Sequence, residues 1–186
     1  YMLKEIHEQP QAVSETLVGR LALDSNQVRL DDVGFTDKQW KSFNRLCLIG
    51  CGTSWHAALA GKYMIEAMAK VPVQVDYGSE FRYRSPVVDQ GTLFVVITQS
   101  GETADTVAAQ KLAREMGLTV LTITNVVGSM TTRLSDGILY TRAGPEIGVA
   151  STKAFIAQLT ALYLVALRLS QAQASMSAAD FERALV

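Results

Sequence analysis

The stretch "LFVVITQSGETADTVAAQKLAREMGLTVLTIT", residues 93–124, contains a complete strand–helix–strand unit. Its two ends, "LFVVIT" and "TVLTIT", are short apolar runs, which is what strands show when both faces of a sheet are buried. Residues 104–116 between them form a helical pattern that is long enough to cross back over the sheet. The unit therefore predicts two parallel strands joined by a right-handed crossover.

The same alternation continues on both sides of this unit. Three further strand-like runs are "RLCLIG", "VQVDY" and "ILYT", and helices are expected at 55–70, 79–83, 129–134 and 152–170. Together these elements predict an α/β fold, with a five-stranded parallel sheet flanked by helices in the flavodoxin-like order 2-1-3-4-5. Ligands on such sheets bind beyond the carboxyl ends of the strands, where the strand order reverses.

The segment before the first strand predicts a helical N-terminal lead-in. Residues 1–23 show a helical pattern broken near Pro10, residues 24–32 form a polar linker, and "TDKQWKSF" predicts a short helix capped by Thr36. At the other end, "SMSAADFERALV" predicts a helix start capped by Ser177. We therefore expect a piece of a longer polypeptide, divided into a lead-in and linker (1–45), a sheet domain (46–174) and the start of a truncated following segment (175–186).

The composition of the 186 residues excludes several classes of protein. With 48% hydrophobic and 19% charged residues, the chain has the balance of a folded globular protein. A net charge of −1 gives no electrostatic basis for binding nucleic acid or an acidic membrane surface. The longest apolar run is shorter than the roughly 18 residues of a membrane span, and the polar N-terminus shows no signal peptide. We therefore expect a cytoplasmic protein with neither a nucleic-acid nor a membrane partner.

The cysteines and histidines give no indication of metal chemistry. Cys47 lies in a strand-like run, which favours a buried thiol, and Cys51 has no cluster of histidines around it. His7 is expected on the surface of the lead-in. His56 follows a glycine loop, and we expect it to pack or to bind the backbone. The sequence predicts no metal ion and no organic cofactor.

The expected helix at 152–170 is unusual because apolar residues surround almost its whole circumference. Only Gln158 and Thr160 interrupt them before Arg168. A helix of this kind is seldom exposed to solvent on one side. Either the core of this chain buries it completely, or another domain or subunit covers its outer face, and the sequence leaves both alternatives open.

Two loops rich in hydroxyl groups follow neighbouring strands of the predicted sheet. They are "GCGTSWH" (50–56) and "TQSGET" (98–103), and each leads into a helix whose first-turn N–H groups attract anions. Neither loop contains a lysine, so neither is a Walker A loop, and Trp55 replaces the third glycine of a dinucleotide-binding loop. A site for a single phosphate remains. Four hydroxyl side chains add short donors to it: Thr53, Ser54, Ser100 and Thr103.

Each of these hydroxyls, taken alone, is more easily explained as a helix cap than as a ligand. It is the pairing of two such loops at the reversal point that favours a site, and Gln99 suits the hydroxyls of a polyol chain. A third stretch, "AGPEIGVASTKAF", fits a connection capped by Ser151 or Thr152 as well as it fits part of a site. Lys153 is unfavourable in a first helical turn and invites a partner such as Glu146, or a ligand.

Four motifs in order carry a resemblance to a known family. "GCGTSWHA", "SEFRYR", "TQSGETADT" and "EIGVASTKAF" resemble the isomerase region of the glutamine–fructose-6-phosphate aminotransferase family, and specifically its first sugar isomerase (SIS) domain. The resemblance implies an enzyme that converts fructose 6-phosphate and glutamine into glucosamine 6-phosphate and glutamate. It also implies a glutaminase domain and a second SIS domain as partners in the full-length chain, and a homodimer.

The resemblance also implies which residues bind hexose 6-phosphate. Thr98, Ser100 and Thr103 would bind the phosphate, and the family often has serine at the position of Thr98. Ser54 and Gln99 would contact the sugar hydroxyls, and Val149 would act through its backbone. The complete set is Thr53, Ser54, Thr98, Gln99, Ser100, Thr103, Val149 and Ser151.

No catalytic residue of the family falls within these 186 residues, so we expect the chain to bind the sugar phosphate without turning it over. A regulatory sugar-phosphate sensor and a stand-alone phosphosugar isomerase are the rival functions. A stand-alone isomerase needs its own base, for which Glu102 or Glu146 could be proposed, although Glu102 is better explained as a first-turn acid of the following helix.

Overall fold

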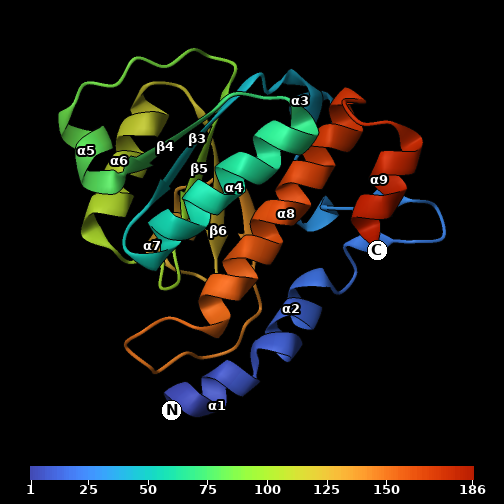
Figure 1. Cartoon of the computed structure of the whole chain (residues 1–186). Helices are drawn as coiled ribbons and strands as arrows, with labels where there is room; N and C mark the ends of the chain where they lie inside the picture. The colour runs from blue at the N-terminus through green and yellow to red at the C-terminus, as the bar shows by residue number, and fades with distance from the viewer.

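In the computed structural model, which describes residues 1–186, a parallel sheet forms the centre of the molecule (Figure 1). Its strand order, β4-β3-β5-β6-β7, confirms the predicted 2-1-3-4-5 arrangement. Every predicted strand is present with its bounds within one residue of those expected. The strands are β3 (Arg45–Gly50), β4 (Val73–Tyr77), β5 (Thr92–Ile97), β6 (Thr119–Thr124) and β7 (Gly137–Tyr140).

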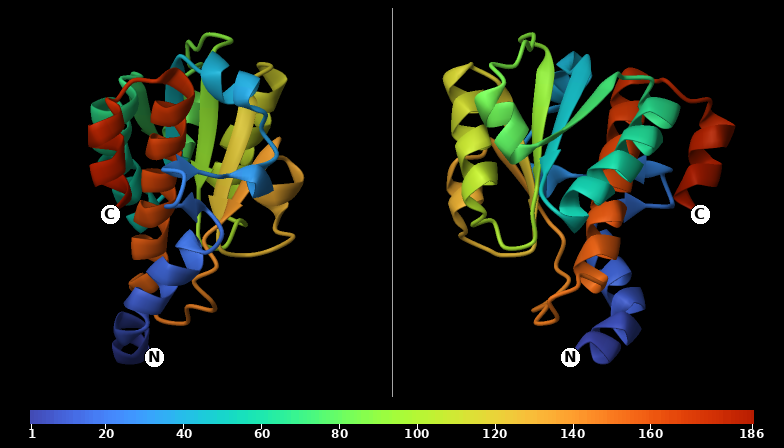
Figure 2. Two further views of the ribbon diagram at one scale, coloured as in Figure 1. Left: turned by 90° about the vertical axis from the view of Figure 1, so that its right-hand side faces the viewer. Right: turned by 60° about the vertical axis from the view of Figure 1, so that its left-hand side comes forward.

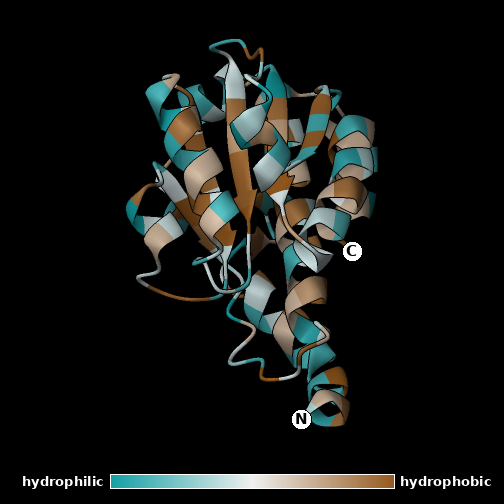
Figure 3. Ribbon diagram, turned by 90° about the vertical axis from the view of Figure 1, so that its left-hand side faces the viewer, coloured by the Kyte–Doolittle hydropathy of each residue, from teal (hydrophilic) through white to brown (hydrophobic).

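Helices cover both faces of the sheet, and the strands between them are the most hydrophobic part of the fold (Figures 2 and 3). Along β3, Leu46 and Leu48 face one side, while Cys47 and Ile49 belong to the core of the other side. Burial raises the pKa of the Cys47 thiol to about 12, as expected of an inert buried cysteine. One face carries α4 (Thr53–Ala69) and α8 (Lys153–Gln173), and the other carries α5 (Gly78–Tyr83) and α6 (Ala104–Glu115), with α7 (Met130–Arg133) beside α6.

The lead-in differs from the prediction in three places. It contains two helices, α1 (Met2–His7) and α2 (Gln9–Leu17), and the break lies at Glu8 because Pro10 fits the first turn of α2, where its missing N–H is not needed. The predicted helix up to residue 23 ends early, at Leu17. The last residues of the predicted helix and the expected polar linker together form an antiparallel hairpin of β1 (Leu21–Ala22) and β2 (Gln27–Val28), followed by the 3₁₀ turn η1 (Asp31–Val33).

The short helix α3 (Asp37–Ser42) has the predicted cap. Thr36 Oγ1 accepts a hydrogen bond from the Gln39 amide, and the Gln39 side chain accepts one from the Thr36 amide. This reciprocal pair is a capping box, which satisfies two otherwise unpaired donors. The prediction succeeded because both partners lie within four residues of sequence.

Arg20 fixes the lead-in to the sheet domain. Its side chain is buried, and its guanidinium donates to the carboxylate of Asp32 at 2.6 Å and to the carbonyls of Thr16 and Tyr140 at 2.8 and 2.9 Å. Tyr140 is the last residue of β7, so the same group joins the end of α2 to the edge of the sheet. The lead-in is therefore packed against the domain rather than tethered to it.

The long helix α8 is buried mainly by this chain itself. By length and composition it could cross a membrane, but most of it lies inside the fold. It packs closely along α4, where a side chain at Gly61 would come within 2.9 Å of Leu162. α2 and α9 (Ala178–Leu185) cover part of its outer face, and Ser177 caps α9 as predicted. An apolar groove of about 400 Å³ remains between these helices.

Candidate functional site

A cavity of about 460 Å³ opens at the carboxyl end of the sheet, beyond β3 and β5. The β3–α4 loop, the β5–α6 loop and the segment before α8 form its walls. The structure brings all eight predicted site residues to this one cavity: Thr53, Ser54, Thr98, Gln99, Ser100, Thr103, Val149 and Ser151. No lysine or arginine lines it.

The β3–α4 loop turns sharply into its helix. Gly50 allows this turn, because a side chain there would come within 2.8 Å of the backbone of Ser54 and Trp55. Ser54 is buried, and its Oγ accepts a hydrogen bond of 3.0 Å from the side-chain amide of Gln158 in α8. A hydroxyl has one donor and two acceptor positions, so Ser54 keeps its proton for another partner. Thr53 is exposed at the mouth.

The β5–α6 loop uses its hydroxyls in the same way. Thr98 is buried, and its Oγ1 accepts a hydrogen bond from the Gly101 amide at 3.0 Å. Ser100 Oγ accepts from the Glu102 amide at 3.3 Å. Thr103 begins α6, but its side chain makes no capping hydrogen bond, so its hydroxyl is fully available. Two of these groups thus brace the loop and still retain a proton to donate.

The loop also depends on Gly101. Its φ is +73°, and a side chain there would overlap Ser129 Oγ and come within 2.7 Å of Thr131 Oγ1. Glu102 lies before α6 rather than in its first turn, which corrects the prediction. Its carboxylate instead accepts a hydrogen bond of 2.8 Å from the Met130 amide at the start of α7.

The segment before α8 has a different cap from the one predicted. Neither Ser151 nor Thr152 caps the helix with its side chain. The carboxylate of Glu146 does so, accepting from the amides of Thr152 and Ala154 at 2.8 and 3.2 Å and from the Ser151 hydroxyl at 3.1 Å. Both candidate bases, Glu146 and Glu102, are therefore engaged by helix starts.

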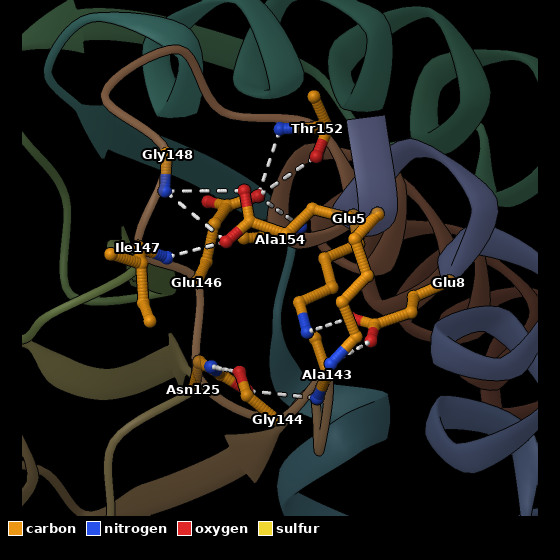
Figure 4. A network of polar contacts seen from close by, with 12 residues as sticks. Glu5, Glu8, Asn125, Ala143, Gly144, Glu146, Ile147, Gly148, Thr152 and Ala154 are labelled. Atoms are coloured by element: carbon orange, nitrogen blue, oxygen red, sulfur yellow. Dashed lines mark hydrogen bonds and ion pairs between the residues drawn. The ribbon is translucent and has the colours of Figure 1, made fainter. Parts of the chain in front are cut away.

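Lys153 does not pair with Glu146. It is buried, and its ammonium donates to the carboxylate of Glu8 at 2.7 Å. Glu146 and Lys153 are seven residues apart, but the carboxylate of Glu146 turns toward the amides of Thr152 and Ala154 (Figure 4). The ammonium of Lys153 instead pairs with Glu8 of the lead-in. The unfavourable position of the lysine at a helix start is thus offset by an acid from another part of the chain.

The same segment presents free backbone donors. The amides of Val149, Ala150 and Ser151 make no hydrogen bond within the chain, and the Val149 side chain is fully exposed. Val149 therefore lines the cavity without packing its side chain into the core, and its action through the backbone stays a prediction.

Seven further residues line the cavity that were not among the predicted site residues: Cys51, Gly52, Ile97, Thr106, Glu146, Gly148 and Ala150. Thr106 stands three residues after Thr103, so helical spacing could have revealed it. Gln158, behind Ser54, comes from a helix more than 100 residues away and leaves no local signal. His56 binds the Gly52 carbonyl through Nδ1 at 3.0 Å, as expected.

Comparison with known proteins identifies related sequences and structures. A family model described as "SIS domain" matches residues 41–168. The chain is 48% identical over 182 residues to a protein of Clostridium tetani named glutamine–fructose-6-phosphate aminotransferase [isomerizing], covering 98% of this chain and 30% of that one. The protein of that name from Caldanaerobacter subterraneus is 52% identical over 177 residues, covering 95% and 29%.

A solved structure described as the C-terminal domain of glucosamine-fructose-6-phosphate aminotransferase from Francisella tularensis superimposes with a TM-score of 0.93. It is 42% identical and covers 100% of this chain and 52% of that one. The chain thus spans about 30% of the length of the curated relatives that it matches.

Proposed function

Because the chain belongs to the SIS domain family, we propose that it is the sugar-phosphate-binding half of the isomerase module of a glutamine–fructose-6-phosphate aminotransferase. The whole enzyme would convert fructose 6-phosphate and glutamine into glucosamine 6-phosphate and glutamate. The single observation that carries the proposal is the cavity, where hydroxyls and free amides from three segments converge without any cation. The curated relatives support the choice of enzyme.

The phosphate would be bound by the β5–α6 loop. Thr98, Ser100 and Thr103 each have a hydroxyl proton to donate, and the first turn of α6 adds its unpaired amides and the positive end of its dipole. Neutral donors that are fixed in place stabilise a phosphate dianion without the long, flexible side chain of a lysine. This supports a small phosphate ester rather than the polyphosphate of a nucleotide.

The sugar would extend from the phosphate toward the β3–α4 loop and the segment before α8. Ser54 can donate to a sugar hydroxyl because its bond with Gln158 uses only an acceptor position and leaves its proton free. Gln99 offers both a donor and an acceptor, and the Val149 amide and Ser151 close the opposite wall. Thr53 lies at the mouth.

This arrangement binds and orients a substrate, but it offers no free base. Glu102 and Glu146 are both held by helix amides, which supports the view that the proton-transfer groups come from elsewhere in the full-length chain. A second SIS domain, a glutaminase domain and a second copy of the chain would complete the enzyme, which would be cytoplasmic. Positioning of the reactants alone is a large part of catalysis.

The proposal is tested by thermal unfolding of the chain with fructose 6-phosphate, glucosamine 6-phosphate, free fructose and ATP in turn. A ligand at about 100 times its Kd stabilises a protein by about 2.7 kcal/mol. We expect both hexose 6-phosphates to raise the Tm, and fructose and ATP to leave it unchanged. A shift with ATP alone would contradict the proposal, and isomerisation by the chain alone would favour a stand-alone phosphosugar isomerase.

A further inference from the structure

The segment that forms one wall of the cavity, residues 145–151, is held by polar contacts rather than by apolar packing. It belongs to no helix or strand. Its two large apolar side chains, Ile147 and Val149, are exposed and do not anchor it in the core. Its conformation therefore depends on the bonds of Glu146 to Ser151 and to the start of α8, and on polar contacts with the lead-in.

Glu5, in the lead-in helix α1, supplies one of these contacts. Its Oε1 accepts from the amides of Ile147 and Gly148 at 2.6 and 3.1 Å, and its Oε2 accepts from the Gly148 amide at 3.1 Å. The side chain is buried, although it is an acid on a terminal helix. Donation by the Ile147 amide lowers the pKa of Glu5, so the carboxylate is charged at neutral pH. Hydrogen bonds to a charged acceptor of this kind are among the strong ones.

The absence of a side chain at Gly148 leaves room for the Glu5 carboxylate. A side chain at Gly148 would come within 2.5 Å of Glu5 Oε2, so the carboxylate occupies the space that any other residue would need. One turn further along, Glu8 binds the ammonium of Lys153. Glu5 thus binds the middle of the segment, and Glu8 binds the first residue of α8, just beyond its end (Figure 4 shows both acids).

We propose that Glu5 is a positioning residue for the sugar end of the ligand, an inference that rests on the proposed function. By binding the amides of Ile147 and Gly148, it fixes the direction in which the next three amides, at 149–151, face the cavity. Without it, those two amides bind water and the segment samples other conformations. The ligand must then order the segment as it binds, which weakens affinity.

Glu5 is expected to affect binding of the sugar and not binding of the phosphate. The β5–α6 loop, which would bind the phosphate, is braced by its own residues Thr98 and Ser100 and makes no hydrogen bond with Glu5. Loss of Glu5 should therefore weaken binding of a hexose 6-phosphate and leave binding of inorganic phosphate unchanged. If Glu5 merely stabilised the fold, its loss would leave both affinities unchanged or would weaken both together.

The experiment measures Kd by titration calorimetry for fructose 6-phosphate and for inorganic phosphate on the 186-residue chain. We expect Glu5→Ala to raise the Kd for fructose 6-phosphate about tenfold, Glu5→Gln to raise it less because the amide oxygen still accepts, and neither to change the Kd for phosphate. Hydrogen exchange at 145–151 should become faster in Glu5→Ala. Glu15→Ala, which removes an exposed acid from α2, is the matched control and should change nothing.

Gly148→Ala tests the same contact from the other side, and it keeps the test open if Glu5→Ala does not fold. The added methyl group displaces the carboxylate, so the same selective loss is expected. Equal affinity for fructose 6-phosphate in wild type and variants would overturn the inference while leaving the proposed function intact. Equal loss for both ligands would also overturn it. A wild-type chain that binds no hexose 6-phosphate would overturn the proposed function and the inference with it.

Discussion

The side chains of the candidate site share one arrangement at the scale of single residues. The oxygen of Ser54 accepts from Gln158, that of Thr98 from the Gly101 amide, and that of Ser100 from the Glu102 amide. In each case the protein uses an acceptor position and leaves the hydroxyl proton for a ligand. A set of oriented donors is what a phosphate ester and its sugar require, because both present acceptors.

Thr103 gives the clearest test at this scale, because its hydroxyl has no partner in the chain. Thr103→Val keeps the shape of the side chain and removes only the donor. We expect the Kd for fructose 6-phosphate to rise about tenfold, which corresponds to one lost hydrogen bond to a charged group. The Tm of the free chain should not change.

Thr119→Val is the control for that substitution. Thr119 begins β6, its side chain makes no hydrogen bond, and it does not line the cavity. Its replacement should leave the Kd unchanged in the same titration. If Thr103→Val bound the sugar phosphate as tightly as the wild type, Thr103 would have to be removed from the phosphate site.

At the scale of elements, prediction from sequence succeeded where the signal was local. The strands were found because each is a compact apolar run between polar loops, and the cap at Thr36 was found because its partner lies three residues away. The hairpin after α2 was missed because each of its strands has only two residues. The caps of α7 and α8 were missed because Glu102 lies 28 residues from the amide that it binds, and Glu146 lies six and eight residues from its two amides.

Substitution of Gly101 tests how closely the β5–α6 loop packs on the start of α7. Gly101→Ala introduces strain at a φ of +73° and a methyl group that overlaps Ser129 Oγ. Gly128→Ala introduces the same strain, at a φ of +74°, with no atom within 4 Å. We expect Gly128→Ala to lower the free energy of unfolding by about 1 kcal/mol, and Gly101→Ala to lower it by at least about 2 kcal/mol more because of the clash.

Urea denaturation measures both free energies. The difference between the two variants isolates the contact with α7 from the cost of the backbone conformation. Equal values would mean that the loop yields to the added methyl group without cost. The β5–α6 loop would then deform more easily than its hydrogen bonds indicate.

At the scale of the whole molecule, the lead-in packs on the sheet domain and contacts the candidate site. Glu5 binds the wall of the cavity, Glu8 binds Lys153 at the start of α8, and Arg20 joins the end of α2 to the last strand. These contacts join residues more than 100 positions apart, so no pattern in the sequence predicted them. The division at residue 45 into a lead-in and a sheet domain stays a prediction about the chain, while the contacts cross that boundary at several points.

Substitution of Arg20 tests whether the lead-in and the sheet unfold together. Arg20→Met keeps most of the buried volume but leaves the Asp32 carboxylate and the carbonyls of Thr16 and Tyr140 without their donor. We expect the free energy of unfolding to fall by about 3 kcal/mol, in a single transition seen by both circular dichroism and the fluorescence of Trp40 and Trp55. Arg29→Met is the matched control, since Arg29 is exposed and makes no ion pair or side-chain hydrogen bond. Two separate transitions in the wild-type chain would contradict this view, because the lead-in would then unfold independently and its acids could not hold the cavity wall.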